Sequence, residues 1–313
     1  ALQQETGCGI AEADITAPGA CERAVSEAVA HLGGLTTLIN CAGVLMPGAI
    51  GTTASLKDFE HNFAGNTRSV FEMMEHSIPH LKERSADGSC SIVNISSVNG
   101  LQSFGGVATY CAAKAAVDML TKCAALDLAP FGIRANAVNP GLVLTELQKR
   151  GGLNDEQYAA LVQRSLEVTH PLFQSRGRAP DPSEVADLIA FLASDKALFV
   201  TGDSIKIDGG PPPNMPGNMP PIMPAIMPPP PAEGGRRSAS KVGRSGGARS
   251  QKNGMRARGV QRVRPRPAWA PRGAAPAPAA KSGWDVGVAW WRLWYVGLTS
   301  QGTAWARHSL CKY

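Results

Sequence analysis

The stretch Asn94-Ile-Ser-Ser97, followed by Tyr110-Cys-Ala-Ala-Lys114, decides how the sequence is interpreted. The apolar β-branched residues at 92–95 predict a buried strand, and the alanine-rich run at 107–129 predicts a long helix. Tyr110 and Lys114 are four residues apart, so both side chains leave one helix face. Ser97 follows the carboxyl end of the strand, the edge at which open parallel sheets bind ligands. We therefore expect a hydroxyl, a phenol and an ammonium to meet in one pocket.

Such a trio suits proton transfer to or from an alcohol oxygen. An ammonium about 4 Å from a phenol, at an effective dielectric constant near 20, favours the phenolate by roughly 4 kcal/mol. This energy corresponds to about 3 pKa units, so we expect the pKa of Tyr110 to fall from near 10 to roughly 7, less whatever part of this shift desolvation takes back. The Ser97 hydroxyl is expected to hold the substrate oxygen. Because Tyr-x-x-x-Lys is a common spacing on helices, the alternative is a surface pair with no role.

The trio is part of a longer series of motifs. In chain order the series is Asn40-Cys-Ala-Gly43, Asn66, Ser97, Tyr110, Lys114, Pro140-Gly141 and Asp208-Gly-Gly210. It resembles the short-chain dehydrogenase/reductase family, of the classical 3-oxoacyl-carrier-protein reductase-like type, over residues 13–210. The resemblance implies an α/β fold with a Rossmann-like doubly wound parallel sheet. It also implies an oxidoreductase that transfers hydride between NAD or NADP and a small-molecule carbonyl or secondary alcohol.

The resemblance assigns a role to individual residues. Tyr110 would be the acid/base and Ser97 would bind the substrate oxygen. Lys114 would lower the pKa of Tyr110 and hold the cofactor ribose, while Asn66 would complete a proton relay. The cofactor would contact Asp14, Asn40, Ala42, Gly43, Tyr110, Lys114, Pro140, Gly141, Val143 and Thr145. At position 41 the family has an asparagine, and the thiol of Cys41 cannot supply its amide donors.

The sequence lacks part of the cofactor site that the resemblance implies. Residues 9–14 predict the third strand of the family, and no first strand, glycine-rich turn, first helix or second strand precedes them. In the family this turn brings backbone amides and a helix N-terminus to the cofactor pyrophosphate. The glycine pairs at 33–34, 105–106 and 151–152 lack its spacing. We therefore expect an N-terminally truncated domain whose sheet lacks its first two strands and which holds its cofactor weakly.

The remaining pattern predicts helices at 20–32, 56–81 and after Asp181-Pro-Ser-Glu184, and strands at 37–40, 133–138 and 204–208. In the helix at 56–81 the expected buried stripe consists of Phe59, Phe63, Val70, Phe71 and Met74. In the family, the long helices at 56–81 and 107–129 form the oligomer interface, so the resemblance implies a homo-oligomer. The alternative function is an inactive fragment that acts as an oligomerisation or binding partner. His76 and His80 have metal-ligand spacing but no third ligand, so no metal site is predicted.

Composition places a domain boundary after residue 210. Residues 1–210 hold 15 Lys and Arg against 23 Asp and Glu, a formal charge of −8, whereas residues 211–313 hold 16 against 2, or +14. The Pro-, Met-, Arg- and Trp-rich tail at 211–313 is expected to be disordered, with nucleic acid or anionic membrane as weak partners. It is alternatively not a selected protein segment. Seven cysteines without a C-x-x-C pair, and no apolar stretch of about 18 residues, favour a cytoplasmic protein.

Overall fold

The computed structural model describes residues 9–86 and 90–210, so the tail predicted to be disordered lies outside the described residues. At its centre is a four-stranded parallel sheet in the order β1-β2-β3-β4. The strands are β1 Thr37–Asn40, β2 Cys90–Ile95, β3 Ile133–Pro140 and β4 Ser204–Ile207. Asn40 is paired with Asn94, and Asn94 with Ala137. All four strands therefore end at one edge of the sheet, as the predicted α/β fold requires.

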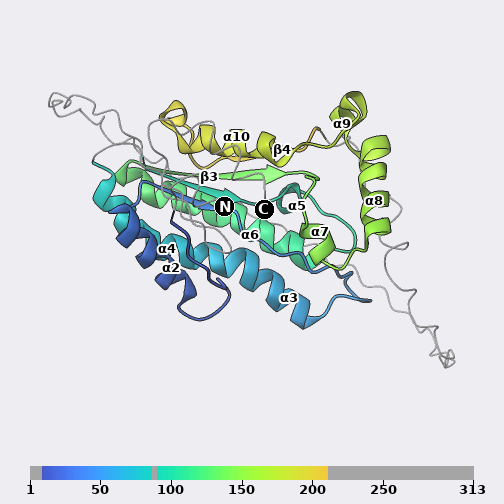
Figure 1. Ribbon diagram of the computed structural model, residues 1–313, viewed down its shortest axis with the longest axis horizontal. Helices are drawn as coiled ribbons and strands as arrows, with labels where there is room; N and C mark the ends of the chain where they lie inside the picture. The colour runs from blue at the N-terminus through green and yellow to red at the C-terminus, as the bar shows by residue number, and fades with distance from the viewer. Residues whose placement is uncertain (1–8, 87–89, 211–313) are drawn as a thin grey trace, which may run out of the picture. The chain divides into compact units, whose positions relative to one another are not determined.

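Helices cover both faces of this sheet (Figure 1). On one face lie α2 Ala20–Leu32, α3 Leu56–Phe63, α4 Ser69–Arg84 and α6 Ala108–Leu128, and on the other lies α10 Pro182–Ala193. One apolar cluster joins α2, α4 and α6 to the sheet, and a second joins α10 to it. The shorter helices are α5 Val98–Leu101, α7 Leu147–Arg150, α8 Asp155–Arg164 and α9 Pro171–Arg176. The two π turns are η1 Ala64–Arg68 and η3 Ser165–Thr169, and the two 3-10 turns are η2 Ala129–Phe131 and η4 Asp195–Ala197.

Local chemistry fixes the ends of α2 and α10 where the sequence predicts them. The helix α2 ends at Gly33, whose φ of 73° is a left-handed conformation that glycine adopts without strain. At the start of α10, Asp181 and Glu184 form a capping box, and Pro182 takes the first helical position. Both predicted helices are confirmed.

The predicted helix at 56–81 is instead α3, the π turn η1 and α4 in succession. Val70 and Met74 are buried as expected, but Phe59 is 42% exposed and Phe71 46% exposed. A π turn holds more residues than an α turn, so it changes which residues of a helix face the core. The prediction of Phe59 and Phe71 as core residues is therefore wrong.

The strand predicted at 9–14 does not form. Ile10 makes an isolated bridge, and the chain then runs as coil and turn from 11 to 19. A strand is held by hydrogen bonds to a neighbour, and an apolar alternation cannot show whether a neighbour is present. Among the described residues the sheet begins with β1, so this stretch has no place in it.

In the described part of the chain, no helix has the length and apolar character that crossing a membrane requires.

Candidate active site

Ser97, Tyr110 and Lys114 meet at the carboxyl edge of the sheet. Ser97 lies two residues beyond β2 and caps α5, its hydroxyl accepting a hydrogen bond from the Asn99 N–H at 3.1 Å. Tyr110 and Lys114 face inward from α6, and all three residues are buried, with exposed fractions of 9%, 5% and 3%. The Ser97 side chain hydrogen-bonds Tyr110, and the Lys114 ammonium lies 5.8 Å from the centre of the Tyr110 ring. The predicted convergence of these three groups is confirmed.

The ionisation of the pair differs from the expectation. Burial raises the pKa of Tyr110 to about 12, and the hydrogen bond with Ser97 lowers it in part. Burial also lowers the pKa of Lys114 to about 8. The Lys114 Nζ donates to the Ile95 carbonyl oxygen at 2.9 Å, so its charge is directed at the end of β2. The prediction that lysine brings the pKa of Tyr110 to roughly 7 is wrong because desolvation of the phenolate dominates, and the Lys114 ammonium is not among the groups that lower this pKa.

Asn66 lies in the π turn η1 and is fully buried beside the trio. Its amide donates to the carbonyl oxygen of Val44 at 2.9 Å and accepts from the N–H of Val44 at 3.0 Å. It also donates to the carbonyl oxygen of Asn62 at 2.8 Å, an acceptor within the helix itself. In the same π turn, Thr67 donates to the Ala113 carbonyl oxygen at 2.9 Å, which ties the turn to α6.

A second asparagine, which was not predicted from the sequence, lies one turn earlier and makes the same pair of bonds, a clamp in which one side-chain amide binds both backbone polar groups of a residue. Asn62 donates to the Met46 carbonyl oxygen at 2.9 Å and accepts from the Met46 N–H at 3.0 Å. It also donates to the Thr109 hydroxyl at 2.7 Å, next to Tyr110. The two amides thus bind alternate residues of the segment after β1, as a neighbouring strand would. The four-residue spacing of Asn62 and Asn66 is the signal by which the pair could have been found.

Gly43 lies close to both Asn66 and Lys114. A Cβ atom at position 43 would lie 2.9 Å from Asn66 Oδ1 and 3.4 Å from Lys114 Nζ. Position 43 therefore has room for glycine and for no larger residue. The neighbouring Ala42 packs on the first apolar cluster and Cys41 on the second.

The side chain of Asn40 braces the sheet. It donates to Asn94 Oδ1 at 2.8 Å across β1 and β2, and Asn94 donates in turn to the Thr121 hydroxyl of α6 at 2.9 Å. All three residues are buried. The loss of the family's asparagine at position 41 leaves this brace intact.

The segment after β3 lies at the same edge of the sheet as Ser97. The N–H of Gly141 donates to the Ile207 carbonyl oxygen at 3.1 Å, and a Cβ atom on Gly141 would lie 2.9 Å from the Asp208 Cβ. Pro140 ends β3, and Val143 is buried against the second apolar cluster. The Thr145 hydroxyl accepts from the Leu147 N–H at 3.5 Å. The predicted contacts of Pro140, Gly141, Val143 and Thr145 with the cofactor stay predictions.

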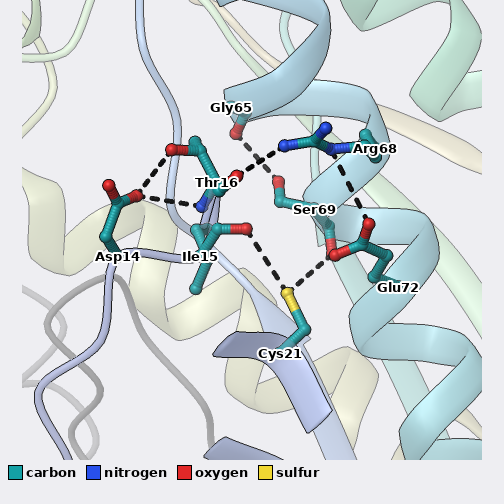
Figure 2. A network of polar contacts seen from close by, with 8 residues as sticks. All are labelled: Asp14, Ile15, Thr16, Cys21, Gly65, Arg68, Ser69 and Glu72. Carbon is teal, nitrogen blue, oxygen red and sulfur yellow. Dashed lines mark hydrogen bonds and ion pairs between the residues drawn. The ribbon is translucent and has the colours of Figure 1, made fainter. Parts of the chain in front are cut away.

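Asp14 belongs to a different network, shown in Figure 2. Its Oδ1 accepts from the N–H of Thr16 at 2.9 Å and from the Thr16 hydroxyl at 2.7 Å, and these bonds lower the pKa of Asp14. The Thr16 carbonyl oxygen accepts from Arg68 at 2.5 Å, and Arg68 pairs with Glu72 at 3.7 Å. This network anchors the loop before α2 to η1 and α4. None of these contacts links Asp14 to the trio.

Comparison with known proteins places this arrangement in a family. The family described as enoyl-(acyl carrier protein) reductase matches residues 1–211. The chain belongs to the short-chain dehydrogenase/reductase family. It is 35% identical to a 2,5-dichloro-2,5-cyclohexadiene-1,4-diol dehydrogenase of Sphingobium indicum over 63% of this chain and 73% of that protein. It is 37% identical to a 3-alpha-(or 20-beta)-hydroxysteroid dehydrogenase of Mycobacterium bovis, over 63% of this chain and 68% of that protein.

Solved structures of family members share the fold. A short-chain dehydrogenase/reductase of Caenorhabditis elegans, solved with cofactor, superposes with a TM-score of 0.56 and 32% identity, over 63% of this chain and 73% of that one. A second structure, ElxO with NADP bound, gives a TM-score of 0.53 and 32% identity, over 63% of this chain and 75% of that one.

Two features are compatible with the nicotinamide-ribose part of a cofactor. The backbone at Gly43 approaches the buried Lys114 ammonium closely, and β3 ends at Pro140 on the same sheet edge as Ser97. None of the four described strands is followed by a G-x-G-x-x-G turn, which would hold the pyrophosphate. Within the same residues, no group of three His, Cys, Asp or Glu side chains is arranged to hold a metal ion.

Proposed function

We propose that this short-chain dehydrogenase/reductase transfers hydride between a nicotinamide cofactor and a ring carbonyl or ring secondary alcohol. The observation that carries the proposal is the buried convergence of Ser97, Tyr110 and Lys114 at the carboxyl edge of the sheet. A nicotinamide cofactor, when bound, supplies or accepts the hydride. Lys114 and Gly43 would hold its ribose side, with Pro140, Gly141, Val143 and Thr145 on its nicotinamide side.

The protein's own part is to hold the substrate oxygen and to move one proton. Ser97 donates a hydrogen bond to the substrate oxygen and holds it beside the Tyr110 hydroxyl. Because burial keeps the pKa of Tyr110 near 12, the phenol carries its proton at neutral pH and donates it to the oxygen of a carbonyl being reduced. In alcohol oxidation the phenol must first lose that proton, so oxidation is favoured by high pH. Asn66 fixes Val44, the residue that follows Gly43 beside Lys114.

The proposed substrate class comes from the two relatives. One is described as oxidising a diol on a six-membered ring and the other a hydroxysteroid, so both names describe hydroxyl groups on alicyclic rings. A secondary alcohol on a ring presents its carbon in a fixed orientation, which lowers the entropic cost of aligning it for hydride transfer. We therefore propose an alicyclic alcohol or ketone in preference to an acyclic thioester.

A substrate panel tests this proposal. The full chain would be given NAD⁺ or NADP⁺ with cyclohexanol, a 3α-hydroxysteroid and an acyclic secondary alcohol, and the reduced cofactor would be followed by its absorbance. The reverse reaction would use the matching ketones together with a 3-oxoacyl thioester. Turnover of the ring compounds above the acyclic ones is expected. Turnover of the thioester alone, or of no compound, would contradict the proposal.

A second candidate function is assembly with another copy of the chain or with an intact relative. Large apolar side chains are exposed on the two long helical segments: Phe59, Phe71, Met119 and Leu126. Such side chains favour burial against a partner, because each buried apolar residue contributes roughly 1.5–3 kcal/mol. Sedimentation of the full chain tests this function, with Met119→Lys and Leu126→Lys expected to shift an oligomer towards monomer. A wild-type monomer at high concentration would contradict it.

A further inference from the structure

A buried carboxylate that the proposed reaction does not use lies one helical turn after Lys114. Asp118, on α6, is only 3% exposed. The Asn139 Nδ2, near the end of β3, donates to both of its oxygens, at 2.9 Å to Oδ1 and 3.1 Å to Oδ2. The hydroxyl of Ser204, on β4, donates to Oδ1 at 3.4 Å, and the Ser96 hydroxyl also hydrogen-bonds the carboxylate. Asp118 therefore joins α6 to the ends of three strands.

Asp118 is linked to Ser97 through Asn139. The same Nδ2 atom of Asn139 donates to the backbone carbonyl oxygen of Ser97 at 2.8 Å. Asn139 is fully buried, and within the described residues its Oδ1 has no hydrogen-bond partner. A buried acceptor without a partner is costly, yet turning the amide over would set this oxygen against a carboxylate and a carbonyl. The carboxylate of Asp118 thus fixes the amide in the orientation that holds the backbone of Ser97.

Asp118 is also linked to Lys114. The single proton of the Ser96 hydroxyl is shared between two acceptors, the Asp118 carboxylate and the Lys114 carbonyl oxygen, the latter at 3.0 Å. Burial lowers the pKa of Lys114, and the negative charge of Asp118 opposes this effect and raises it. On the carboxylate itself, burial raises the pKa, whereas its hydrogen bonds and the charge of Lys122 lower it.

Gly100 leaves the space that this arrangement needs. A Cβ atom at position 100 would lie 2.3 Å from Asp118 Oδ2 and 2.9 Å from the backbone carbonyl carbon and oxygen of Lys114. The helix α5, which Ser97 caps, can therefore lie against α6 only because residue 100 has no side chain. Ser97, Asp118 and Lys114 are held together as one packed unit.

We propose that Asp118 is a positioning residue of the reaction, which fixes Ser97 through the Asn139 amide and places a negative charge one helical turn from Lys114. Its kinetic consequences rest on the proposed function. Its effect on Lys114 rests on the four-residue spacing of the two residues on α6 and on the contact that each makes with Ser96.

The principal variant is Asp118→Asn, which keeps the side-chain size and removes the charge. Asp127→Asn is its matched control, because it removes one carboxylate from the exposed face of the same helix. Asn139→Ala tests the link to Ser97. Its control is Asn136→Ala on the same strand, where the lost bonds, to Val200 and Asp203, lie outside the site. Circular dichroism establishes that each variant is folded.

The kinetic measurement is kcat and KM for the best ring substrate across a range of pH. Asp118→Asn and Asn139→Ala are expected to lower kcat by about tenfold or more at an unchanged cofactor KM. In the profile of kcat against pH, activity falls where Lys114 loses its proton. In Asp118→Asn this fall is expected at lower pH than in the wild type, a shift that simple destabilisation would not produce. Unchanged kcat and an unchanged pH profile would overturn the proposal.

A measurement without turnover separates this proposal from the proposed function. The chain is labelled with [ε-13C]lysine, and the resonance lost in Lys114→Arg identifies Lys114. Its titration midpoint is expected near pH 8 in the wild type and roughly one unit lower in Asp118→Asn, with Asp127→Asn unchanged. If no substrate is turned over, the proposed function fails while this shift still supports Asp118. An unshifted midpoint contradicts the role of Asp118 whether or not the chain is an enzyme.

Discussion

The Asn66 amide binds both backbone polar groups of Val44, accepting from its N–H at 3.0 Å and donating to its carbonyl oxygen at 2.9 Å. Asn62 makes the same pair of bonds to Met46. Two residues further on, Gly48 forms a parallel bridge with Val107, just before α6. The segment after β1 is therefore held by two side-chain amides at Val44 and Met46 and by a backbone bridge at Gly48. Through these contacts it connects α3 and η1 to α6, the helix that carries Tyr110.

Asn62→Ala tests the importance of the second amide clamp. It leaves the N–H and carbonyl of Met46 without their partner in a partly buried position, and we expect a loss of about 2–3 kcal/mol in the free energy of unfolding. Thr109→Val is the matched control, because it removes only one of the three Asn62 contacts and should cost less than about 1.5 kcal/mol. Urea denaturation measures both. Equal losses in the two variants would show that Asn62 does not act through Met46.

Gly43→Ala tests the close approach beside Lys114. The added methyl would lie 2.9 Å from Asn66 Oδ1, which is fixed by Val44, so we expect a loss of about 1–3 kcal/mol and a marked fall in nicotinamide affinity. Gly105→Ala is the control, because a Cβ atom there meets nothing within 4 Å. Denaturation and fluorescence titration with NADH or NADPH report the two effects. A Gly43→Ala protein that behaves like Gly105→Ala would contradict this account of the site.

The buried Lys114 predicts a particular dependence of stability on pH. Its pKa is about 8 in the folded protein against 10.5 when unperturbed, so between these values the unfolded chain binds more protons. Stability therefore rises with pH across this window, and the penalty for burying the charge applies in full below it. Relative to Lys114→Met, we expect the wild type to gain about 3 kcal/mol between pH 8 and pH 10.5. Denaturant unfolding of both proteins across that range measures the gain, and a constant difference would refute it.

Periodicity and strand-end geometry were enough to predict most of the elements and the convergence of the trio. The spacing of Tyr110 and Lys114 fixed their shared face, and the position of Ser97 after β2 brought it to the same edge. Both inferences depend only on local geometry, which a sequence specifies well.

The features that the sequence did not predict all depend on tertiary surroundings. The π turn at η1 accompanies amide contacts with Val44 and Met46, and nothing in residues 64–68 alone distinguishes it from an α turn. The pKa of Tyr110 depends on how completely the phenol is buried, which spacing cannot give. The stretch 9–14 has the pattern of a strand, but a strand forms only beside a neighbour. The role of Asp118 was also not predicted, because a charged residue on a helix is usually exposed and its burial here depends on the residues packed around it.

The central claim is that Tyr110 transfers the proton during hydride transfer to a ring ketone, and Tyr110→Phe tests it most directly. Single-turnover reduction would be measured with saturating NADH or NADPH in the wild type, in Tyr110→Phe, and in Tyr158→Phe as a control on the partly exposed tyrosine of α8. The account predicts that Tyr110→Phe slows reduction by about 10²–10⁴-fold and binds the cofactor within a few-fold of wild type, with Tyr158→Phe unchanged. Reduction by Tyr110→Phe at a rate within a few-fold of wild type would contradict it.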